Sequence, residues 1–446
     1  MGITAFRIKR PAAGGGGGGG SPAWYTAMTA GQWSQIPDSK LENCPTFETD
    51  DTFPPYTGGG TGNPGSWNCM AAFGGGTLIT GAGYMYEGST RYDGEIFLQK
   101  GGGHQLGAQA PYFLPLLYDT ASGTPKWKKV YDSKFDGGGI YICATPGVSF
   151  VGGYPVASQT YASLSYIESE NKMYQIACTF CHKDNGSGNN SGDFQSVARS
   201  LTLNCGTVSP DVNNPFTEIA APPVGGCGAA AHEKPNGSNG TKGRIWYQEQ
   251  GTGQFGYYDP AADTYSSLSG LSYAAASQPT MAIDQNRGIA CIVGHYSPGL
   301  DNTFAIGHLQ LSNIAQDWYS YSGHNNAALI GLNVANPGST PTPGDANGND
   351  PTIVWNQDDD CFVVWYGGKT LHKLRPPASS PYKSGNNWTW DPVTPAGGDT
   401  PSSNTANFGS TNGQGTYGRF QYISNPLIRG YMLVHGPREN VYFYKV

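Results

Sequence analysis

The chain has 446 residues, of which 66 are glycine and 32 are proline, while charged residues make up only 13%. Helices draw heavily on Ala, Leu, Glu, Lys and Arg, so this composition argues against a helical protein. Aromatic residues reach 12%, which excludes a disordered chain, because disordered chains lack the apolar material for a core. The net charge of −7 argues against a nucleic-acid partner, since phosphate binding requires concentrated Lys and Arg. We expect an all-β protein rich in turns.

The chain begins with a short basic peptide, residues 1–10, in which apolar and basic side chains alternate. The alternating residues and the base that follows them are Phe6, Arg7, Ile8, Lys9 and Arg10. An extended peptide of this pattern has one apolar and one basic face, which suits an added strand or a groove on a larger assembly. We therefore expect residues 1–10 to anchor the protein to such an assembly. A disordered tail without a role is the alternative.

An unbroken glycine run over residues 14–20 separates this peptide from the rest. Glycines have no side chains to pack, so the run is typical of a flexible tether. We expect residues 1–22 to form anchor and tether, and residues 23–446 to form a single domain. No stretch approaches the roughly 18 apolar residues of a transmembrane helix, and no apolar segment follows the first bases as in a secretory signal. Neither membrane insertion nor Sec export is expected.

A recurring unit organises the body of the chain. Each unit has a short strand, a turn and a second, strongly apolar strand, and turn residues such as Gly74–Gly76 separate the two. The six predicted strand pairs are 68–73 with 77–80, 162–167 with 173–181, a weaker copy from 228 with 244–247, 279–283 with 289–295, 351–355 with 361–366, and 420–423 with 431–435. Such repetition is typical of a β-propeller, with six blades expected and seven as the alternative.

Later parts of several units add a third strand and then a fourth that carries Trp or Tyr. The examples are Leu117–Asp119 before Trp127, Tyr257–Pro260 before Tyr265, and Leu309–Leu311 before Trp318. Together with the glycine pair Gly74 and Gly75, this pattern resembles the Kelch-like, galactose-oxidase-type propellers. The resemblance covers about 400 residues as a pattern only, and most units lack the glycine pair. It implies blades of four antiparallel strands around a central channel.

The two ends of the body complement each other. The last unit stops at its third strand, residues 441–446, and residues 31–37 around Trp33 form a strand with no predecessor. Pairing the two would close the ring and remove both open sheet edges. We expect an N-terminal strand to close the propeller.

The segment from Cys178 through Cys181 to His182 matches the attachment pattern of a c-type haem. However, residues 176–182 align without gaps with residues 289–295, and Cys178 also aligns with Cys361. The alignment predicts a small core cysteine on the second strand of three blades, so we expect no haem. The nine cysteines show no framework spacing, and we expect most of them to be reduced thiols.

The same alignment places His182, His295 and Trp365 where the second strand enters a loop at one rim of the ring. These residues, with Tyr296, Trp388 and Arg438, are the candidate rim-loop binding residues. A calcium loop is weakly suggested by the alternating oxygen ligands Asp345, Asn347 and Asn349, but the later bidentate Glu is missing, so an ordinary turn is expected. No other metal or cofactor is expected. We expect the acidic cluster 358–360 to be the solvated tip of a hairpin. The alternative is a pair of carboxylates that meet across the channel, as glycoside hydrolysis requires.

We find no catalytic set, and two functions remain. The first is a non-enzymatic structural or binding propeller on a larger assembly, such as a phage virion or tail component, whose rim loops bind glycan or protein. A subunit of an extracellular appendage is a related alternative. The second is a Kelch-like carbohydrate-active enzyme, an oxidase or a hydrolase, that acts at the mouth of the channel.

Overall fold

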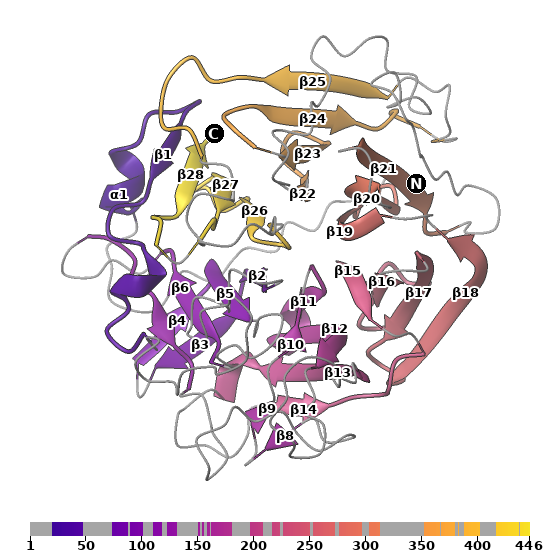
Figure 1. Ribbon diagram of the computed structural model, residues 1–446. Helices are drawn as coiled ribbons and strands as arrows, with labels where there is room; N and C mark the ends of the chain where they lie inside the picture. Colours follow the sequence, from indigo (N-terminus) through magenta and orange to yellow (C-terminus); the bar gives the residue numbers. More distant parts are fainter. Residues whose placement is uncertain are drawn as a thin grey trace, which may run out of the picture.

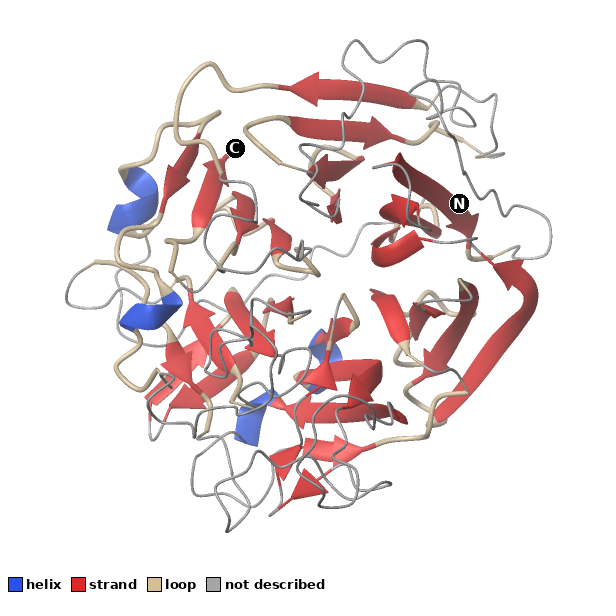
Figure 2. Ribbon diagram, in the orientation of Figure 1, coloured by secondary structure: helices blue, strands red, loops and turns tan. Residues whose placement is uncertain are grey.

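The computed structural model describes residues 20–47, 74–87, 90–100, 110–117, 123–131, 150–151, 154–155, 158–160, 162–180, 197–207, 216–223, 226–249, 253–272, 276–296, 303–312, 352–365, 367–379, 382, 388–401, 416–436 and 438–446. Six antiparallel sheets surround a central axis as the blades of a β-propeller (Figure 1). Strands form nearly all of the regular structure (Figure 2). The predicted all-β, six-bladed fold is confirmed.

The innermost strands, nearest the axis, are β2, β11, β15, β19, β22 and β26, and each is called the first strand of its blade; in blade six, β1 comes earlier in the chain but is the outermost strand. Blade one contains β2 (Gly75–Ile79), β5 (Ile96–Lys100), β6 (Tyr112–Pro115) and β7 (Lys128–Lys129). Blade two contains β11 (Leu164–Ile167), β12 (Lys172–Phe180), β13 (Val197–Asn204) and β14 (Phe216–Glu218), and β10 (Ser158–Gln159) also pairs with β12. Blade three contains β15 (Cys227–Glu233), β16 (Arg244–Glu249), β17 (Gln254–Asp259) and β18 (Thr264–Ser272).

The remaining blades follow the same order. Blade four has three strands within the described residues, β19 (Ala276–Asp284), β20 (Ile289–Tyr296) and β21 (Thr303–Gln310). Blade five contains β22 (Thr352–Asn356), β23 (Cys361–Trp365), β24 (Leu371–Arg375) and β25 (Thr389–Val393). Blade six contains β26 (Phe420–Ile423), β27 (Gly430–Leu433), β28 (Tyr442–Lys445) and β1 (Trp33–Gln35).

A few short elements lie outside the blades. Two hairpins are formed by β3 (Tyr84–Glu87) with β4 (Thr90–Asp93), and by β8 (Phe150–Val151) with β9 (Tyr154–Pro155). The helical elements are α1 (Ala23–Thr26) and the 3-10 turns η1 (Leu41–Asn43), η3 (Glu168–Glu170) and η4 (Cys205–Thr207). Within the described residues, no helix has both the length and the apolar character needed to cross a membrane.

The strand at the N-terminal end closes the ring. β1 pairs antiparallel with β28, and Trp33 lies opposite Tyr444. Trp33 O also accepts a hydrogen bond from Asp399 N at 2.9 Å, which ties the closing strand to the segment after blade five. The predicted closure by the strand around Trp33 is therefore confirmed, and the outer edge of β28 is covered.

The predicted strand pairs agree with the structure in five units, and the first unit is a correction. Residues 74–76 were expected to form a turn, but Gly75 and Gly76 lie in β2, the innermost strand of blade one. A Cβ at Gly76 would overlap the ring of Phe97 in the neighbouring strand β5. The glycine is needed for close packing rather than for a turn. Residues 68–73 lie outside the described part.

The core consists of layers between neighbouring blades rather than one central mass. Six buried apolar clusters occur, one at each junction around the ring. At the junction of blades six and one, Phe97 packs with Phe443 and Met432. Because the blades hold one another through these layers, the axis itself stays open for a channel.

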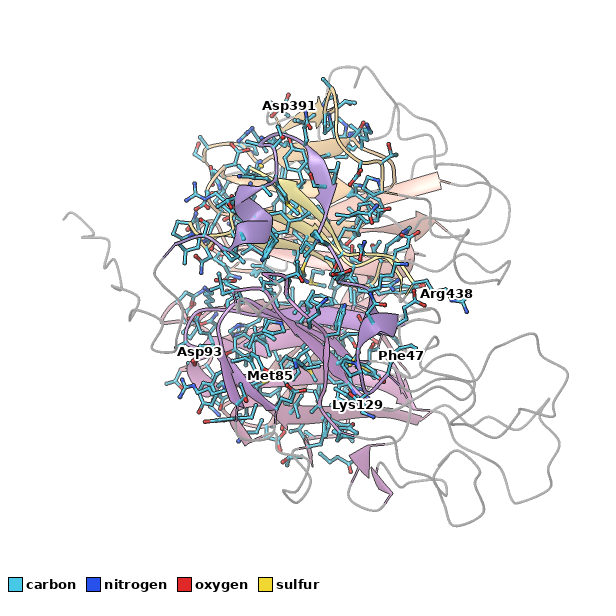
Figure 3. All side chains as sticks on the ribbon, turned by 90° about the vertical axis from the view of Figure 1, so that its left-hand side faces the viewer. Phe47, Met85, Asp93, Lys129, Asp391 and Arg438 are labelled. Carbon is cyan, nitrogen blue, oxygen red and sulfur yellow. The ribbon has the colours of Figure 1, made fainter. Side chains whose placement is uncertain are left out.

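The two faces of the ring carry different connections. We call the face that carries the connections between first and second strands the turn face. The β3–β4 hairpin, with Met85 and Asp93, lies in such a connection and belongs to this face. Arg438, in the connection between the second and third strands of blade six, lies on the opposite side of the molecule (Figure 3).

Candidate functional site

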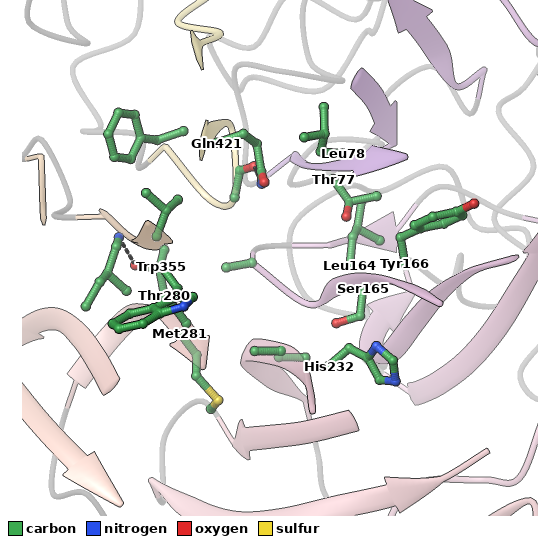
Figure 4. Close-up of a pocket in the computed structure, with 18 of the residues that line it drawn as sticks. Thr77, Leu78, Leu164, Ser165, Tyr166, His232, Thr280, Met281, Trp355 and Gln421 are labelled. Atoms are coloured by element: carbon green, nitrogen blue, oxygen red, sulfur yellow. Dashed lines mark hydrogen bonds between the residues drawn. The ribbon is translucent and has the colours of Figure 1, made fainter. Parts of the chain in front are cut away.

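A cavity of about 240 Å³ lies among the innermost strands. All six blades contribute to its wall, through side chains from β2, β11, β15, β19, β22 and β26 and the residues next to them (Figure 4). It therefore lies on the axis of the ring. A ligand bound there would be surrounded by protein on several sides, as is usual for binding sites of small molecules.

Each first strand contributes one residue to this cavity at an equivalent position. This is the residue just before the last one that pairs with the second strand. Its six occupants are Leu78, Tyr166, His232, Ile283, Trp355 and Tyr422. Four of them carry an aromatic ring or an imidazole and are half-buried, whereas the two aliphatic residues are buried. Because first strands end at the turn face, these rings line the end of the channel that opens toward that face.

Hydrogen bonds hold three of these rings in place. Tyr166 donates to Asn171 Oδ1 at 2.8 Å, and Tyr422 donates to Asp358 Oδ2 at 2.6 Å. His232 Nε2 lies 2.8 Å from Lys242 O. Burial lowers the pKa of His232, so its imidazole is neutral at pH 7. These contacts leave the faces of the rings, rather than their polar atoms, available in the channel.

The cavity wall carries no formal charge. Among its described lining residues there is no Asp, Glu, Lys or Arg, and His232 is the sole histidine. Within the described residues, no group of three His, Cys, Asp or Glu side chains is placed to hold a metal ion. Apart from His232, the described wall thus offers hydroxyl, amide and aromatic groups, which bind ligands but do not transfer protons readily near neutral pH.

Polar contacts connect neighbouring blades at the turn face, with at least one at each of the six junctions. They join Glu95 with Asn425, Tyr84 with Asn171, Glu170 with Lys242, His232 with Gln285, Arg287 with Asp360, and Asp358 with Arg429. The distances range from 2.6 Å between Glu170 Oε1 and Lys242 Nζ to 3.3 Å between Asp358 Oδ2 and Arg429 Nε, leaving aside the shorter Arg287–Asp360 contact. These contacts fix the position of the turns that surround the channel mouth.

The acidic cluster 358–360 takes part in these contacts. Asp359 is paired with Lys373 at 2.5 Å and with Arg375 at 3.0 Å. Burial opposes ionisation of Asp359, but hydrogen bonds from Lys373 and Arg375 outweigh it and lower the pKa of this carboxyl. The cluster forms the tip of the β22–β23 hairpin, as predicted, but its carboxylates are paired with cations rather than simply solvated.

Two of the predicted rim residues are buried. Trp365 is fully buried, and its indole donates to Gly368 O at 3.0 Å. Trp388 is 2% exposed and its indole donates to Tyr382 O at 3.2 Å. This differs from the exposed placement expected, because rings of neighbouring elements, such as Phe420 beside Trp365, cover them. Neither ring is available to a ligand in this conformation.

The other predicted residues fall in different places. Arg438 is exposed, on the face opposite the turn face. His295 and Tyr296 lie on β20, where only their backbone is described. His182 lies outside the described residues, as do the anchor residues Phe6 to Arg10 and the candidate calcium ligands Asp345, Asn347 and Asn349. The structure therefore does not bring the predicted rim residues together, and their binding role stays a prediction.

The three aligned cysteines are all buried on second strands, as expected, but their alignment needs correction. Cys361 lies opposite Asn356 at the end of the hairpin, Cys291 lies opposite Ala282, and Cys178 lies opposite Arg199 beyond a β-bulge. They therefore lie at three different distances from the turn that precedes the second strand. His295 and Trp365, inferred from the same alignment, are likewise not equivalent.

The rings at the turn-face end of the channel were missed by the sequence analysis. Each of them lies one position before the end of its observed first strand. The predicted strand ends show this register for Tyr166 and Tyr422 only, because the predicted strand 351–355 ends at Trp355 itself and the copy from 228 had no predicted end.

Comparison with protein families and with curated proteins finds no match to this sequence. Several solved structures have a similar fold. "Structure of YjhT" has 12% identity and a TM-score of 0.40 over 82% of this chain and 93% of that one. A chain of a nidogen–laminin complex has 9% identity and a TM-score of 0.34, over 74% and 89%. An exo-β-1,3-galactanase from Phanerochaete chrysosporium has 12% identity and a TM-score of 0.33, over 71% and 60%.

Similarity at this level carries no functional information. The propeller assignment rests on the strand pairing described above, and the finer resemblance to Kelch-like propellers stays a prediction.

Proposed function

We propose that the protein is a non-enzymatic binding propeller that takes a ligand at its channel. The composition of the channel wall carries this proposal. Glycoside hydrolysis uses a pair of carboxylates that flank the scissile bond, one of them protonated at the start. The described wall contributes hydroxyl, amide and aromatic groups and no carboxylate. Such a wall can hold a ligand, but it has no group for acid–base catalysis at neutral pH except His232.

The acidic residues 358–360, one of which accepts a hydrogen bond from the lining residue Tyr422, also suit a structural role. A general acid needs a raised pKa so that it holds its proton near neutral pH. Hydrogen bonds from Arg287 lower the pKa of Asp360, and those from Lys373 and Arg375 lower that of Asp359. Asp358 accepts a hydrogen bond from Tyr422 and pairs with Arg429. The lowered pKa values keep Asp359 and Asp360 ionised at neutral pH, and all three carboxylates have partners, which favours a rigid mouth over a catalytic centre.

We also propose that residues 1–10 attach the propeller to a larger assembly, with a phage virion or tail as the most specific version. The described chain starts at Gly20, next to α1 and the closing strand β1. β1 is the outermost strand of blade six, so the chain enters the propeller at its circumference. An attachment there would leave the channel free for binding.

The channel function can be tested by screening small neutral, anionic and cationic compounds for a shift in melting temperature, with turnover measured on every compound that binds. Ser165 lines the cavity, and Ser165→Leu would fill it; the matched control is Ser267→Leu on the outer strand β18. We expect binding without turnover, lost in Ser165→Leu and kept in the control. Turnover that depends on the channel would refute the non-enzymatic proposal.

The attachment can be tested separately by removing residues 1–12, which lie before the described propeller. We expect the truncated protein to fold normally but to be missing from the native particle. Full incorporation of the truncated protein would refute the anchor.

A further inference from the structure

One wall of the channel carries polar groups, and one of them, the Ser165 hydroxyl, has no hydrogen-bond partner within the described residues. Ser165 on β11 is 4% exposed, and its Oγ forms no hydrogen bond within the described part of the chain. The hydroxyls of Ser165 and Thr77 point into the cavity (Figure 4). Gln421 donates from Nε2 to Gly418 O at 2.6 Å, which leaves its Oε1 for another donor. A buried polar group without a partner costs free energy, so a ligand or water that pairs with these groups is favoured.

The facing wall is apolar. Trp355 on β22 and Met281 on β19 lie across the cavity from Thr77 and Ser165 (Figure 4). The Trp355 ring meets the Phe362 ring with centroids 4.8 Å apart, which fixes its orientation. A flat ring with a thioether beside it favours contact with C–H groups of a ligand. The cavity is therefore polar on one side and apolar on the other.

Charge and size narrow the ligand further. The lining residues that the structure describes offer no formal charge to pair with an ionised ligand, and burying an unpaired charge is costly. The volume of about 240 Å³ lies below the lower end, about 300 Å³, of pockets that hold drug-sized ligands. The enclosed part of the cavity therefore suits a small ligand, about the size of a single ring.

We infer that the channel binds a neutral, polyhydroxylated ring, such as a monosaccharide or a cyclitol, with its hydroxyls on Thr77, Ser165 and Gln421 and its C–H face on Trp355. Such a ring has hydroxyls around its edge and C–H groups on its faces, which matches the two walls. This inference rests on the proposed function of the channel. The ring could be a free small molecule or the terminal unit of a longer glycan.

The test is calorimetric titration of the full chain with methyl glucoside, methyl galactoside, methyl mannoside and myo-inositol. Glucuronate and glucosamine serve as anionic and cationic counterparts of the same size. We expect at least one neutral compound to bind and the charged ones to bind at least about 10-fold more weakly, since an unpaired charge would be buried. Binding of the same sugar on an immobilised glycan distinguishes a glycan terminus from a free ligand.

Ser165→Ala is the most informative variant. Because Ser165 Oγ has no described protein partner, removing it should not lower the midpoint of urea unfolding. Losing one neutral hydrogen bond to the ligand should weaken binding roughly 3- to 10-fold. Trp355→Leu should also weaken binding, and Ser267→Ala, an exposed serine on β18, should change neither property.

Several outcomes would overturn the inference. They are no binding of any neutral compound, equal or tighter binding of glucuronate or glucosamine, and unchanged affinity in Ser165→Ala, as expected if only water occupies the polar wall. Binding of charged compounds alone would leave the proposed channel function intact while refuting the neutral ligand. Turnover of a bound neutral sugar would refute the non-enzymatic function while leaving the neutral ligand intact.

Discussion

Trp33 in the first strand and Tyr444 in the last strand lie opposite each other, and their rings meet edge to face with centroids 5.6 Å apart. Trp33 is fully buried, and its indole Nε1 donates to Lys369 O at 2.9 Å. Because Lys369 belongs to the β23–β24 connection, one side chain joins the closing strand to blade five as well as to blade six. The two ends of the chain are thus fastened where the ring would otherwise open.

Replacing Trp33 by Ala should destabilise the protein strongly. The change removes a fully buried indole together with its hydrogen bond, so we expect a loss of about 3–5 kcal/mol in the free energy of unfolding. Urea unfolding followed by circular dichroism measures this loss. Trp33→Phe should cost less, since it keeps a ring against Tyr444. Equal stability of the alanine variant and the wild type would contradict the role of Trp33 in closure.

Deleting residues 1–40 should make the protein prone to aggregation. The deletion removes β1 and exposes the outer edge of β28, whose backbone groups would then be free to pair with another chain. We expect light scattering and sedimentation to show oligomers that the full chain does not form. Removal of residues 1–12 alone is the control, because it leaves β1 intact. A stable, monomeric 41–446 fragment would show that closure is dispensable.

The hairpins at the turn face could be predicted because their turn chemistry is local. Asp284 Oδ1 accepts hydrogen bonds from the backbone of Asn286 and Arg287, and Asn356 Oδ1 does the same for Asp358 and Asp359. Such side chains favour turns through contacts two or three residues away, so the sequence alone reveals them. The strand pairs on either side then follow from their apolar content.

Exposure of the rim residues could not be predicted in the same way. Trp365 is covered by Phe420 and His435, which come from blade six and lie at least 55 positions further along the chain. Whether a ring at a strand end is open or covered depends on what the neighbouring blade places beside it. The channel wall also needs all six first strands together, so its lack of charge emerges only from the assembled ring.

Asp360→Asn should weaken the junction of blades four and five in a pH-dependent manner. Arg287 donates to both carboxylate oxygens of Asp360, and these hydrogen bonds lower its pKa. A lowered pKa in the folded state stabilises the fold above the unfolded value of about 4, and this stabilisation is lost as the pH falls through the folded pKa. The Asp360 side chain is 52% exposed, so the effect at pH 7 should be only about 0.2–1 kcal/mol.

Urea unfolding of the wild type and Asp360→Asn at pH 7 and at pH 3 measures this difference. The two proteins should differ at pH 7 and converge at pH 3. A difference that stays constant with pH would contradict an electrostatic origin.

His372 should make the protein sensitive to mild acid. It is 2% exposed and stacks on Trp390 with ring centroids 5.0 Å apart, and burial lowers its pKa to about 4. Between the unfolded value of about 6.5 and the folded value, the unfolded state binds a proton that the folded state does not. Stability should therefore fall as the pH drops through this window, by up to about 1.4 kcal/mol per pH unit.

Unfolding midpoints measured from pH 7 to pH 4.5 would show this decline. His372→Phe retains an aromatic ring beside Trp390 and removes the titration, so its decline should be shallower. Identical slopes in the two proteins would exclude His372 as the source.

The buried thiols should be unreactive in the native protein. Five of the nine cysteines, Cys44, Cys178, Cys205, Cys291 and Cys361, are buried free thiols in the described structure. Burial raises the pKa of Cys178 to about 12, and a thiol must lose its proton to react. Cys178 Sγ also lies 2.7 Å from Ser163 Oγ, inside the layer between blades, where a haem thioether has no room. With Ellman's reagent at pH 8, we expect no more than four thiols to react before unfolding and five more to appear in guanidinium. The purified protein should show no Soret band. A fifth reactive thiol in the native state would mean that at least one of these five cysteines is not buried as described. A haem that survives denaturation would mean that the β12 strand is not packed as described.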